Sequence, residues 1–188
     1  MALVNRTAPF DYVIFGATGD LTRRKLLPAF LRRFHAGEFG HDVRLICIAR
    51  SEYTTEAFRA YIRGELHKFA PDMTADQELL GNFIALLDYV QLDATDPEAN
   101  WQPLHEALPD PERIRVFYLA TAPSLYSHIC AALATRDLIS PHARVVLAKP
   151  IGTSLATARE VNSGVGRSFP EESVHRIAHY FGKEGVQS

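Results

Sequence analysis

Short apolar runs alternate along the chain with longer segments in which apolar residues recur every three or four positions. The runs are rich in β-branched and aromatic residues, and their apolar side chains stand at consecutive positions, which indicates strands buried on both faces of a parallel sheet. The predicted strands cover residues 11–17, 43–49, 88–93, 114–120, 144–150 and 174–180. A sheet made of such strands must be covered by helices on both faces.

Helical spacing is found between the predicted strands, at residues 21–34, 54–69, 75–87, 100–108, 124–138 and 154–166. The clearest apolar stripe, in the second of these segments, consists of Phe58, Tyr61, Ile62, Leu66 and Phe69. Pro28 falls inside the first predicted helix, where it removes a hydrogen bond and should kink the helix. The alternation of strands and helices predicts a doubly wound, Rossmann-like α/β fold with a mostly parallel sheet, helices on both faces and right-handed crossovers.

The composition is that of a soluble globular domain. Of the 188 residues, 47% are hydrophobic and 22% are charged, and the net charge of −2 gives no electrostatic reason to expect nucleic acid or a membrane surface as a partner. The chain has no apolar run of membrane-spanning length, and its N-terminus lacks the apolar core of a signal peptide. Cys47 and Cys130 lie in apolar segments, so two buried free thiols in a reducing cytoplasm are favoured over a disulfide.

A glycine-rich turn, FGATGDLTRRK (residues 15–25), joins the first predicted strand to the first helix. Gly16 and Gly19 allow a tight turn with a close approach of the backbone to a ligand, and the helix N-terminus offers N–H groups to a pyrophosphate. The spacing is G-x-x-G and not G-x-G-x-x-G, so its place between a strand and a helix carries most of the prediction. The alternative is an ordinary glycine turn in which Asp20 caps the helix.

The residues after the second predicted strand bear on the choice between NAD and NADP. A domain that binds NAD places Asp or Glu there, to bind the 2′-hydroxyl of the ribose. This sequence has Arg50 and Ser51 at that point, and a guanidinium fork with a neighbouring hydroxyl suits a 2′-phosphate. We therefore predict NADP as the cofactor. The alternative is a solvated loop arginine, and the neighbouring Glu52 weighs against a purely cationic site.

Four motifs together resemble the glucose-6-phosphate dehydrogenase family. GATGDLTRRKLLPAF (16–30) resembles the G-x-[ST]-G-D-L signature near the start of these enzymes, and VFYLATAPSLY (116–126) resembles their fourth-strand segment. LAKPIG (147–152) resembles their E-K-P-x-G, and RIAHYFGKEGVQ (176–187) resembles their R-I-D-H-Y-L-G-K-E-T-V-Q. The order and spacing agree over essentially the whole chain, and the last motif is the most specific. The resemblance implies oxidation of glucose 6-phosphate to 6-phosphogluconolactone with NADP, the first step of the pentose phosphate pathway.

The resemblance also implies roles for individual residues. Thr18 and Gly19 would lie against the pyrophosphate, and Ala120, Thr121 and Pro123 would line the nicotinamide side. The implied cofactor-binding residues are Gly16, Thr18, Gly19, Asp20, Leu21, Arg50, Ser51, Ala120, Thr121, Pro123 and Lys149. The implied substrate-binding residues are Lys149, His179, Tyr180 and Lys183. The first would reach the sugar hydroxyls, and the other three would offer a protonated imidazole, a hydroxyl and an ammonium to the sugar phosphate.

Three positions depart from the pattern of the family. Ala148 stands where the family has Glu, Ala178 where it has Asp, and Gly185 where it has Thr. In the family that Asp orients the general-base histidine, which would lie beyond Ser188. The resemblance therefore implies that residues 1–188 form a dinucleotide-binding domain, that the larger C-terminal substrate and dimerisation domain is absent, and that this chain contains no catalytic residue and does not turn over glucose 6-phosphate measurably.

A second function is compatible with the same residues, namely a non-catalytic module that binds NADP or a sugar phosphate. Gly16, Gly19 and Arg50 are retained in such a module, while Ala148 and Ala178 replace acidic residues. Retained cofactor contacts with lost acidic positions are the pattern that this alternative predicts.

Three further expectations concern ligands and partners. Glucose 6-phosphate should bind weakly or not at all without a second domain. Apolar surface around Phe181 and Val186 should be uncovered and promote self-association. His175 and His179 have the i,i+4 spacing of a helical metal site, but they fall in a predicted strand without neighbouring cysteines or carboxylates, so we expect no metal.

Overall fold

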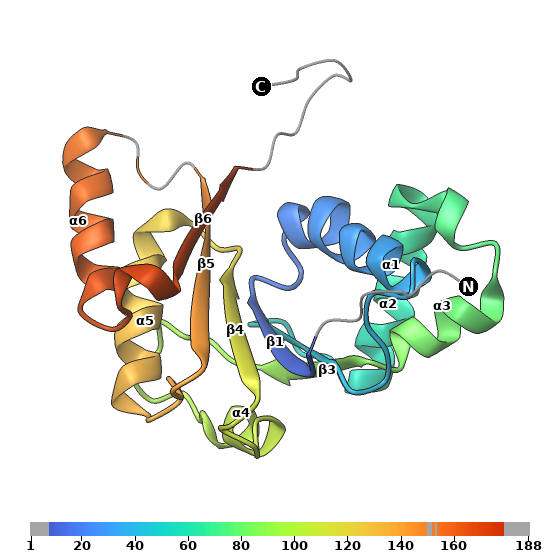
Figure 1. The fold of residues 1–188 in the computed structure, drawn as a ribbon, viewed down its shortest axis with the longest axis horizontal. Coiled ribbons are helices and arrows are strands. Elements are labelled where there is room, and N and C mark those ends of the chain that lie inside the picture. Colours follow the sequence, from blue (N-terminus) through green and yellow to red (C-terminus); the bar gives the residue numbers. More distant parts are fainter. Residues whose placement is uncertain (1–7, 150–151, 153, 179–188) are drawn as a thin grey trace.

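The computed structural model describes residues 8–149, 152 and 154–178, and it confirms the doubly wound α/β fold. Six parallel strands form one sheet in the order β3-β2-β1-β4-β5-β6 (Figure 1). They are β1 (Phe10–Phe15), β2 (Arg44–Ala49), β3 (Leu87–Gln91), β4 (Ile114–Leu119), β5 (Ala143–Lys149) and β6 (Val174–Ala178). The strand order reverses between β1 and β4, and a sheet of this kind binds ligands at that point, outside the carboxyl ends of the strands.

Helices cover both faces of the sheet, with α1, α2 and α3 on one face and α5 and α6 on the other (Figure 1). The helices are α1 (Leu27–His35), α2 (Thr55–Phe69), α3 (Gln77–Ile84), α4 (Gln102–Ala107), α5 (Tyr126–Thr135) and α6 (Leu155–Gly166). Short 3₁₀ turns cover Pro71–Met73, Pro123–Leu125 and Glu171–Ser173. No helix in the described ranges is both long enough and apolar enough to cross a membrane.

Consecutive apolar residues in the central strands supply two separate cores. In β1, Ile14 packs toward α1 and α2, whereas Val13 and Phe15 pack toward α4 and α5. Successive side chains of a strand point to opposite faces, so a strand with a core on each side needs apolar residues at every position. Cys47 and Cys130 are buried in these cores and free, as predicted, and burial raises the pKa of the Cys130 thiol to about 12.

Side-chain caps explain where three of the helices begin. Thr54, Asp76 and Ser154 precede α2, α3 and α6, and the side-chain oxygen of each accepts a hydrogen bond from the backbone N–H three residues later, at 3.0, 3.0 and 3.2 Å. Each bond satisfies a donor that has no partner within the helix. Ser154 and Thr157 complete a reciprocal capping box.

The predicted end of the third helix, at residue 87, is wrong. The helix ends at Ile84, and β3 already begins at Leu87, which pairs with Leu45 of β2. The N–H of Leu45 donates to the carbonyl of Leu86 at 3.0 Å. Apolar residues at 84–87 fit either period, and pairing with β2 decides between them. The first strand likewise ends at Phe15 and not at residue 17, and the other predicted boundaries within the described ranges agree to within a few residues, whereas the predicted strand ends at 150 and 180 lie outside the described residues.

Pro28 interrupts the first helix, as predicted, but the form of the interruption differs from a simple kink. A π turn covers Thr22–Leu26, and the N–H of Leu27 donates to the carbonyl of Thr22, five residues back. Regular α1 begins only at Leu27, so Pro28 lies at the junction of the two parts, where it has no N–H to donate to the preceding turn. The helix that follows the glycine turn therefore has two parts with different registers.

Candidate functional site

The glycine turn after β1 touches the loop after β4. Gly16 has a φ of +90°, and a Cβ atom at this position would lie 2.6 Å from the carbonyl oxygen of Ala120. The N–H of Ala120 in turn donates to the carbonyl of Phe15 at 2.9 Å. Both the backbone angle and the space exclude any side chain at Gly16. The two loops therefore meet at the point where the strand order reverses.

Hydrogen bonds fix the glycine turn to β2 and to the following helix. The N–H groups of Gly16 and Ala17 both donate to the carbonyl of Ile48 at 3.0 Å. The N–H of Gly19 and the hydroxyl of Thr22 both donate to the carbonyl of Gly16, at 3.0 and 2.9 Å. Helical structure starts at residue 20, so the positive end of the helix dipole lies at the carboxyl edge of the sheet. This arrangement suits an anion such as a pyrophosphate.

Arg23 braces the turn from the helix side. Its Nε donates to the carbonyl of Thr18 at 3.0 Å, one guanidinium nitrogen contacts Glu65 of α2 at 3.0 Å, and the other contacts Asp20. Glu65 is 6% exposed and has a second cation, Lys68, at 3.5 Å. The Asp20 carboxylate thus accepts from Arg23, and Asp20 is itself the first helical residue, so it does not precede the helix as an N-cap would. The Arg23 guanidinium is occupied by protein acceptors and supports the loop.

Arg50 and Ser51 lie at the end of β2, where the cofactor preference was predicted, and both side chains are exposed. The backbone carbonyls of both residues accept hydrogen bonds from side chains of β3. The side-chain amide of Gln91 donates to the carbonyl of Arg50 at 3.2 Å, and the hydroxyl of Tyr89 donates to the carbonyl of Ser51. The exposed guanidinium therefore projects from a main chain that is fixed to β3.

The residues predicted for the nicotinamide side lie beside the glycine turn. Ala120 and Thr121 directly follow β4, and Pro123 opens the next 3₁₀ turn. A Cβ at Gly16 would meet the Thr121 methyl at 3.4 Å, and one at Gly19 would lie 3.9 Å from the Ala120 carbonyl. The structure thus brings the turn after β1 and the loop after β4 together, and both adjoin the end of β2.

The predicted substrate side is described only in part. Lys149 ends β5 and pairs in register with Ala178 of β6. Ala148 is 8% exposed, and its carbonyl accepts a hydrogen bond from the Tyr126 hydroxyl at 3.0 Å. The other predicted substrate-binding residues, His179, Tyr180 and Lys183, lie outside the described residues. So do Phe181 and Val186, predicted as uncovered apolar surface, and Gly185, which departs from the family pattern. Within the described ranges, no group of three or more His, Cys, Asp or Glu side chains could hold a metal ion.

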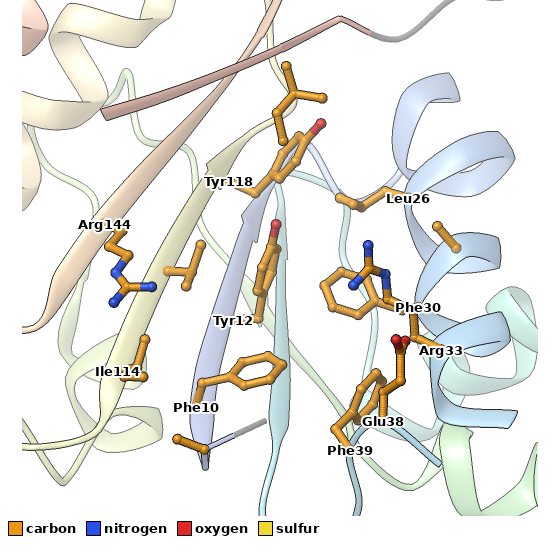
Figure 2. Close-up of a pocket in the computed structure, with 14 residues that line it drawn as sticks. Phe10, Tyr12, Leu26, Phe30, Arg33, Glu38, Phe39, Ile114, Tyr118 and Arg144 are labelled. Atoms are coloured by element: carbon orange, nitrogen blue, oxygen red, sulfur yellow. The ribbon is translucent and has the colours of Figure 1, made fainter. Parts of the chain in front are cut away.

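A separate apolar groove lies on the face of the sheet beside α1. It has a volume of about 510 Å³ and runs between α1 and strands β1, β4 and β5 (Figure 2). Phe10, Tyr12, Phe30 and Tyr118 line it, and Ile177 of β6, 41% exposed, lies at its border. Its lining is mainly apolar and follows the face of the sheet, with Arg33, Glu38 and Arg144 as its charged members (Figure 2).

Four residues that support the site were missed from the sequence: Arg23, Glu65, Tyr89 and Gln91. The i,i+3 spacing of Asp20 and Arg23 was a usable signal for an ion pair on the helix. Two polar side chains at i and i+2 at the end of a buried strand were a signal for hydrogen bonds to the adjacent loop. The pairing of Arg23 with Glu65, which is 42 residues away, had no local signal.

Comparisons with known proteins agree with this geometry. The family model described as glucose-6-phosphate dehydrogenase, NAD binding domain, matches residues 13–188. The chain is 50% identical over 182 residues to a glucose-6-phosphate 1-dehydrogenase of Gluconobacter oxydans, covering 96% of this chain and 37% of that protein. It is 39% identical over 193 residues to the enzyme of Mycolicibacterium smegmatis, covering 98% of this chain and 39% of that protein.

Two solved structures resemble the fold. Glucose-6-phosphate 1-dehydrogenase from Mycobacterium avium superposes with a TM-score of 0.78 at 28% identity, over 91% of this chain and 36% of that one. A glucose-6-phosphate dehydrogenase in complex with its substrate glucose 6-phosphate gives 0.75 at 26% identity, over 94% of this chain and 37% of that one. The chain spans under two-fifths of the length of each of these relatives.

Proposed function

Because the chain belongs to the glucose-6-phosphate dehydrogenase family through its NAD-binding domain, we propose that it binds NADP⁺ at the carboxyl edge of β1, β2 and β4. The observation that carries the proposal is the contact between the turn at Gly16 and the carbonyl of Ala120, where the strand order reverses. A side chain there would fill the space through which a pyrophosphate reaches the helix N-terminus.

The proposed contacts follow from the chemistry of each position. The turn from Gly16 through Leu21, which includes Thr18, Gly19 and Asp20, lies against the pyrophosphate. The guanidinium of Arg50 and the hydroxyl of Ser51 bind the 2′-phosphate, since these two residues stand where an NAD-binding domain places the acidic residue that accepts from a 2′-hydroxyl. Ala120, Thr121 and Pro123 line the nicotinamide side.

The proposed reaction of the whole protein is the NADP-dependent oxidation of glucose 6-phosphate to 6-phosphogluconolactone. Lys149, at the carboxyl end of β5, holds the sugar hydroxyls beside the nicotinamide, and His179, Tyr180 and Lys183 hold the phosphate. The relatives of 50% and 39% identity are named glucose-6-phosphate 1-dehydrogenases, which supports this assignment.

The cofactor proposal is tested by calorimetric titration of the chain with NADP⁺ and, separately, with NAD⁺. We expect saturable binding of both, tighter for NADP⁺. Arg50→Ala should weaken NADP⁺ binding by about tenfold or more, the size of losing a charge-assisted contact, and change NAD⁺ binding by less than about threefold. Equal affinities for the two cofactors in the wild type would contradict the assignment of NADP.

One observation favours a second candidate, a non-catalytic module that binds NADP or a sugar phosphate. Ala148 and Ala178 stand at positions where the family has acidic residues, and Ala178 pairs directly with Lys149. The test is made with the whole protein, because residues 1–188 alone are expected to form no NADPH under either candidate. Formation of NADPH that requires glucose 6-phosphate would favour the dehydrogenase. Binding of both ligands without any NADPH, also after Ala148→Glu and Ala178→Asp are combined, would favour the module.

We propose two further properties of this protein, its cellular environment and its self-association. The buried free thiols of Cys47 and Cys130 suit a reducing cytoplasm. Self-association through uncovered apolar surface is supported by Ile177, which is 41% exposed beside the groove. Sedimentation equilibrium tests it, and Ile177→Lys should weaken the association.

A further inference from the structure

The segment that carries Arg50 is held at successive carbonyls by one neighbouring strand. The hydroxyl of Tyr89 donates to the carbonyl of Ser51, and the carbonyl of Ala49 lies 3.1 Å from the same hydroxyl. The side-chain amide of Gln91 donates to the carbonyl of Arg50 at 3.2 Å. Three consecutive peptide units are therefore oriented by two side chains of β3.

The positions of these two side chains follow from the geometry of the strand. Tyr89 and Gln91 are two residues apart, so they project from the same face of β3. Gln91 pairs with Ala49, the last residue of β2, and Tyr89 pairs with Cys47, two residues earlier. The long tyrosine side chain spans that distance and brings its hydroxyl to the end of β2.

The ring of Tyr89 is fixed by its neighbours. Phe58 of α2 stacks on it with a centroid distance of 4.7 Å, and Tyr53 meets it edge to face at 5.6 Å. The residue is 8% exposed. Burial raises the pKa of Tyr89 to about 12, so the hydroxyl keeps its proton at neutral pH and remains a donor. The bonds to the segment after β2 are thus formed before any ligand arrives.

We propose that Tyr89 and Gln91 are positioning residues that set the direction of the Arg50 side chain and thereby the preference for a 2′-phosphorylated nicotinamide cofactor. Neither side chain needs to touch the cofactor, since both bind the main chain of the segment that does. A guanidinium binds a phosphate best in a planar, two-pronged geometry, which depends on where its backbone points. This inference rests on the proposed binding of NADP⁺.

The proposal makes a differential prediction. NAD⁺ lacks the 2′-phosphate, so its affinity does not depend on the direction of Arg50. Loss of the two hydrogen bonds should lower the preference for NADP⁺ and leave NAD⁺ binding nearly unchanged. A residue that only stabilises the fold would change the binding of both cofactors together.

The experiment measures Kd for NADP⁺ and NAD⁺ with the wild type, Arg50→Ala, Tyr89→Phe and Gln91→Leu. Tyr89→Phe should raise Kd for NADP⁺ about five- to tenfold, the effect of one net hydrogen bond, and Gln91→Leu about two- to threefold because its bond is exposed. Kd for NAD⁺ should stay within about twofold. Tyr12→Phe is the matched control, since it removes a tyrosine hydroxyl from the same face of the sheet, on β1, and should leave both constants unchanged.

The outcomes are distinguishable. If the wild type binds NADP⁺ no more tightly than NAD⁺, the proposed cofactor is wrong and the inference falls with it. If Arg50→Ala abolishes the preference but Tyr89→Phe and Gln91→Leu keep the wild-type ratio of the two constants, the cofactor is right and the positioning role is wrong. The positioning role is also wrong if the two variants weaken the binding of both cofactors equally. Gln91 is exposed, so its variant remains informative even if Tyr89→Phe lowers the stability.

Discussion

Replacing Gly16 by alanine should damage both stability and cofactor binding. The residue has a φ of +90°, which costs an alanine about 1–2 kcal/mol. Its Cβ would lie 2.6 Å from the Ala120 carbonyl oxygen, about 0.8 Å short of the 3.4 Å at which ordinary contacts begin. Two hydrogen-bonded backbones must separate to make that space, which adds about 1–3 kcal/mol in a packed region. We expect Gly16→Ala to lower the free energy of unfolding by about 2–5 kcal/mol.

The assay is urea unfolding followed by circular dichroism, together with a titration with NADP⁺. Affinity should fall at least about tenfold, since the turn that meets the pyrophosphate must move. Gly64→Ala is the matched control: Gly64 lies inside α2 with nothing within 4 Å of an added Cβ, so alanine should stabilise the helix by about 0.5–1 kcal/mol. Wild-type stability and wild-type affinity in Gly16→Ala would refute the reasoning.

The remaining predictions test three other contacts. Arg23→Ala should lower the free energy of unfolding by about 1–3 kcal/mol, since it leaves Glu65 buried with one weak partner; a double-mutant cycle with Glu65→Ala that finds no coupling would contradict the pairing. Burial raises the pKa of Tyr126 from 10.0 to about 12, so the stability that its neutral hydroxyl contributes is full below pH 10 and is lost as the pH rises through 12. Urea unfolding at several pH values should show a smaller loss of stability at alkaline pH for Tyr126→Phe than for the wild type. Identical pH profiles of the two proteins would contradict the prediction. Gly164→Ala places a Cβ 2.5 Å from the Ser127 Cβ, so it should push α6 away from α5. The free energy of unfolding should fall by about 1–3 kcal/mol and the melting temperature by several degrees. Adding Ser127→Gly should restore the wild-type melting temperature.

The fold was predictable because its signal is local. Consecutive apolar residues such as Val13, Ile14 and Phe15 indicate a strand with a core on each side, and both cores are present. The boundaries were harder where one run of residues satisfies two periods. Leu86 and Leu87 continue the helical pattern of α3, but pairing with Leu45 of β2 draws them into the sheet, and that partner is distant in sequence.

The candidate site has local sequence signals for only some of its residues. The glycine turn and Arg50 have sequence signals because each depends on its position directly after a strand. Tyr89 and Gln91 have only the signal of two polar side chains at i and i+2 of a buried strand, since their acceptors are backbone carbonyls, which every residue has. No sequence pattern around Tyr89 indicates that its hydroxyl donates to the carbonyl of Ser51. None around Arg23 indicates that it pairs with Glu65. Such contacts depend on the register of neighbouring elements, which exists only in the folded chain.

The π turn at Thr22–Leu26 has a consequence for insertions and deletions in this part of the chain. Each residue of an α-helix turns the following side chains by about 100°, and a π turn contains the equivalent of one residue more than the α-helical turn it replaces. Deleting one residue within this turn would leave a regular α-helical turn that covers about the same rotation, so Arg23 and Phe30 would keep their directions. Deleting one residue from the regular part of α1, at Leu27–His35, would instead rotate the side chains that follow by about 100° relative to the sheet. Alignments of related chains should therefore show one-residue gaps in Thr22–Leu26 more often than in Leu27–His35.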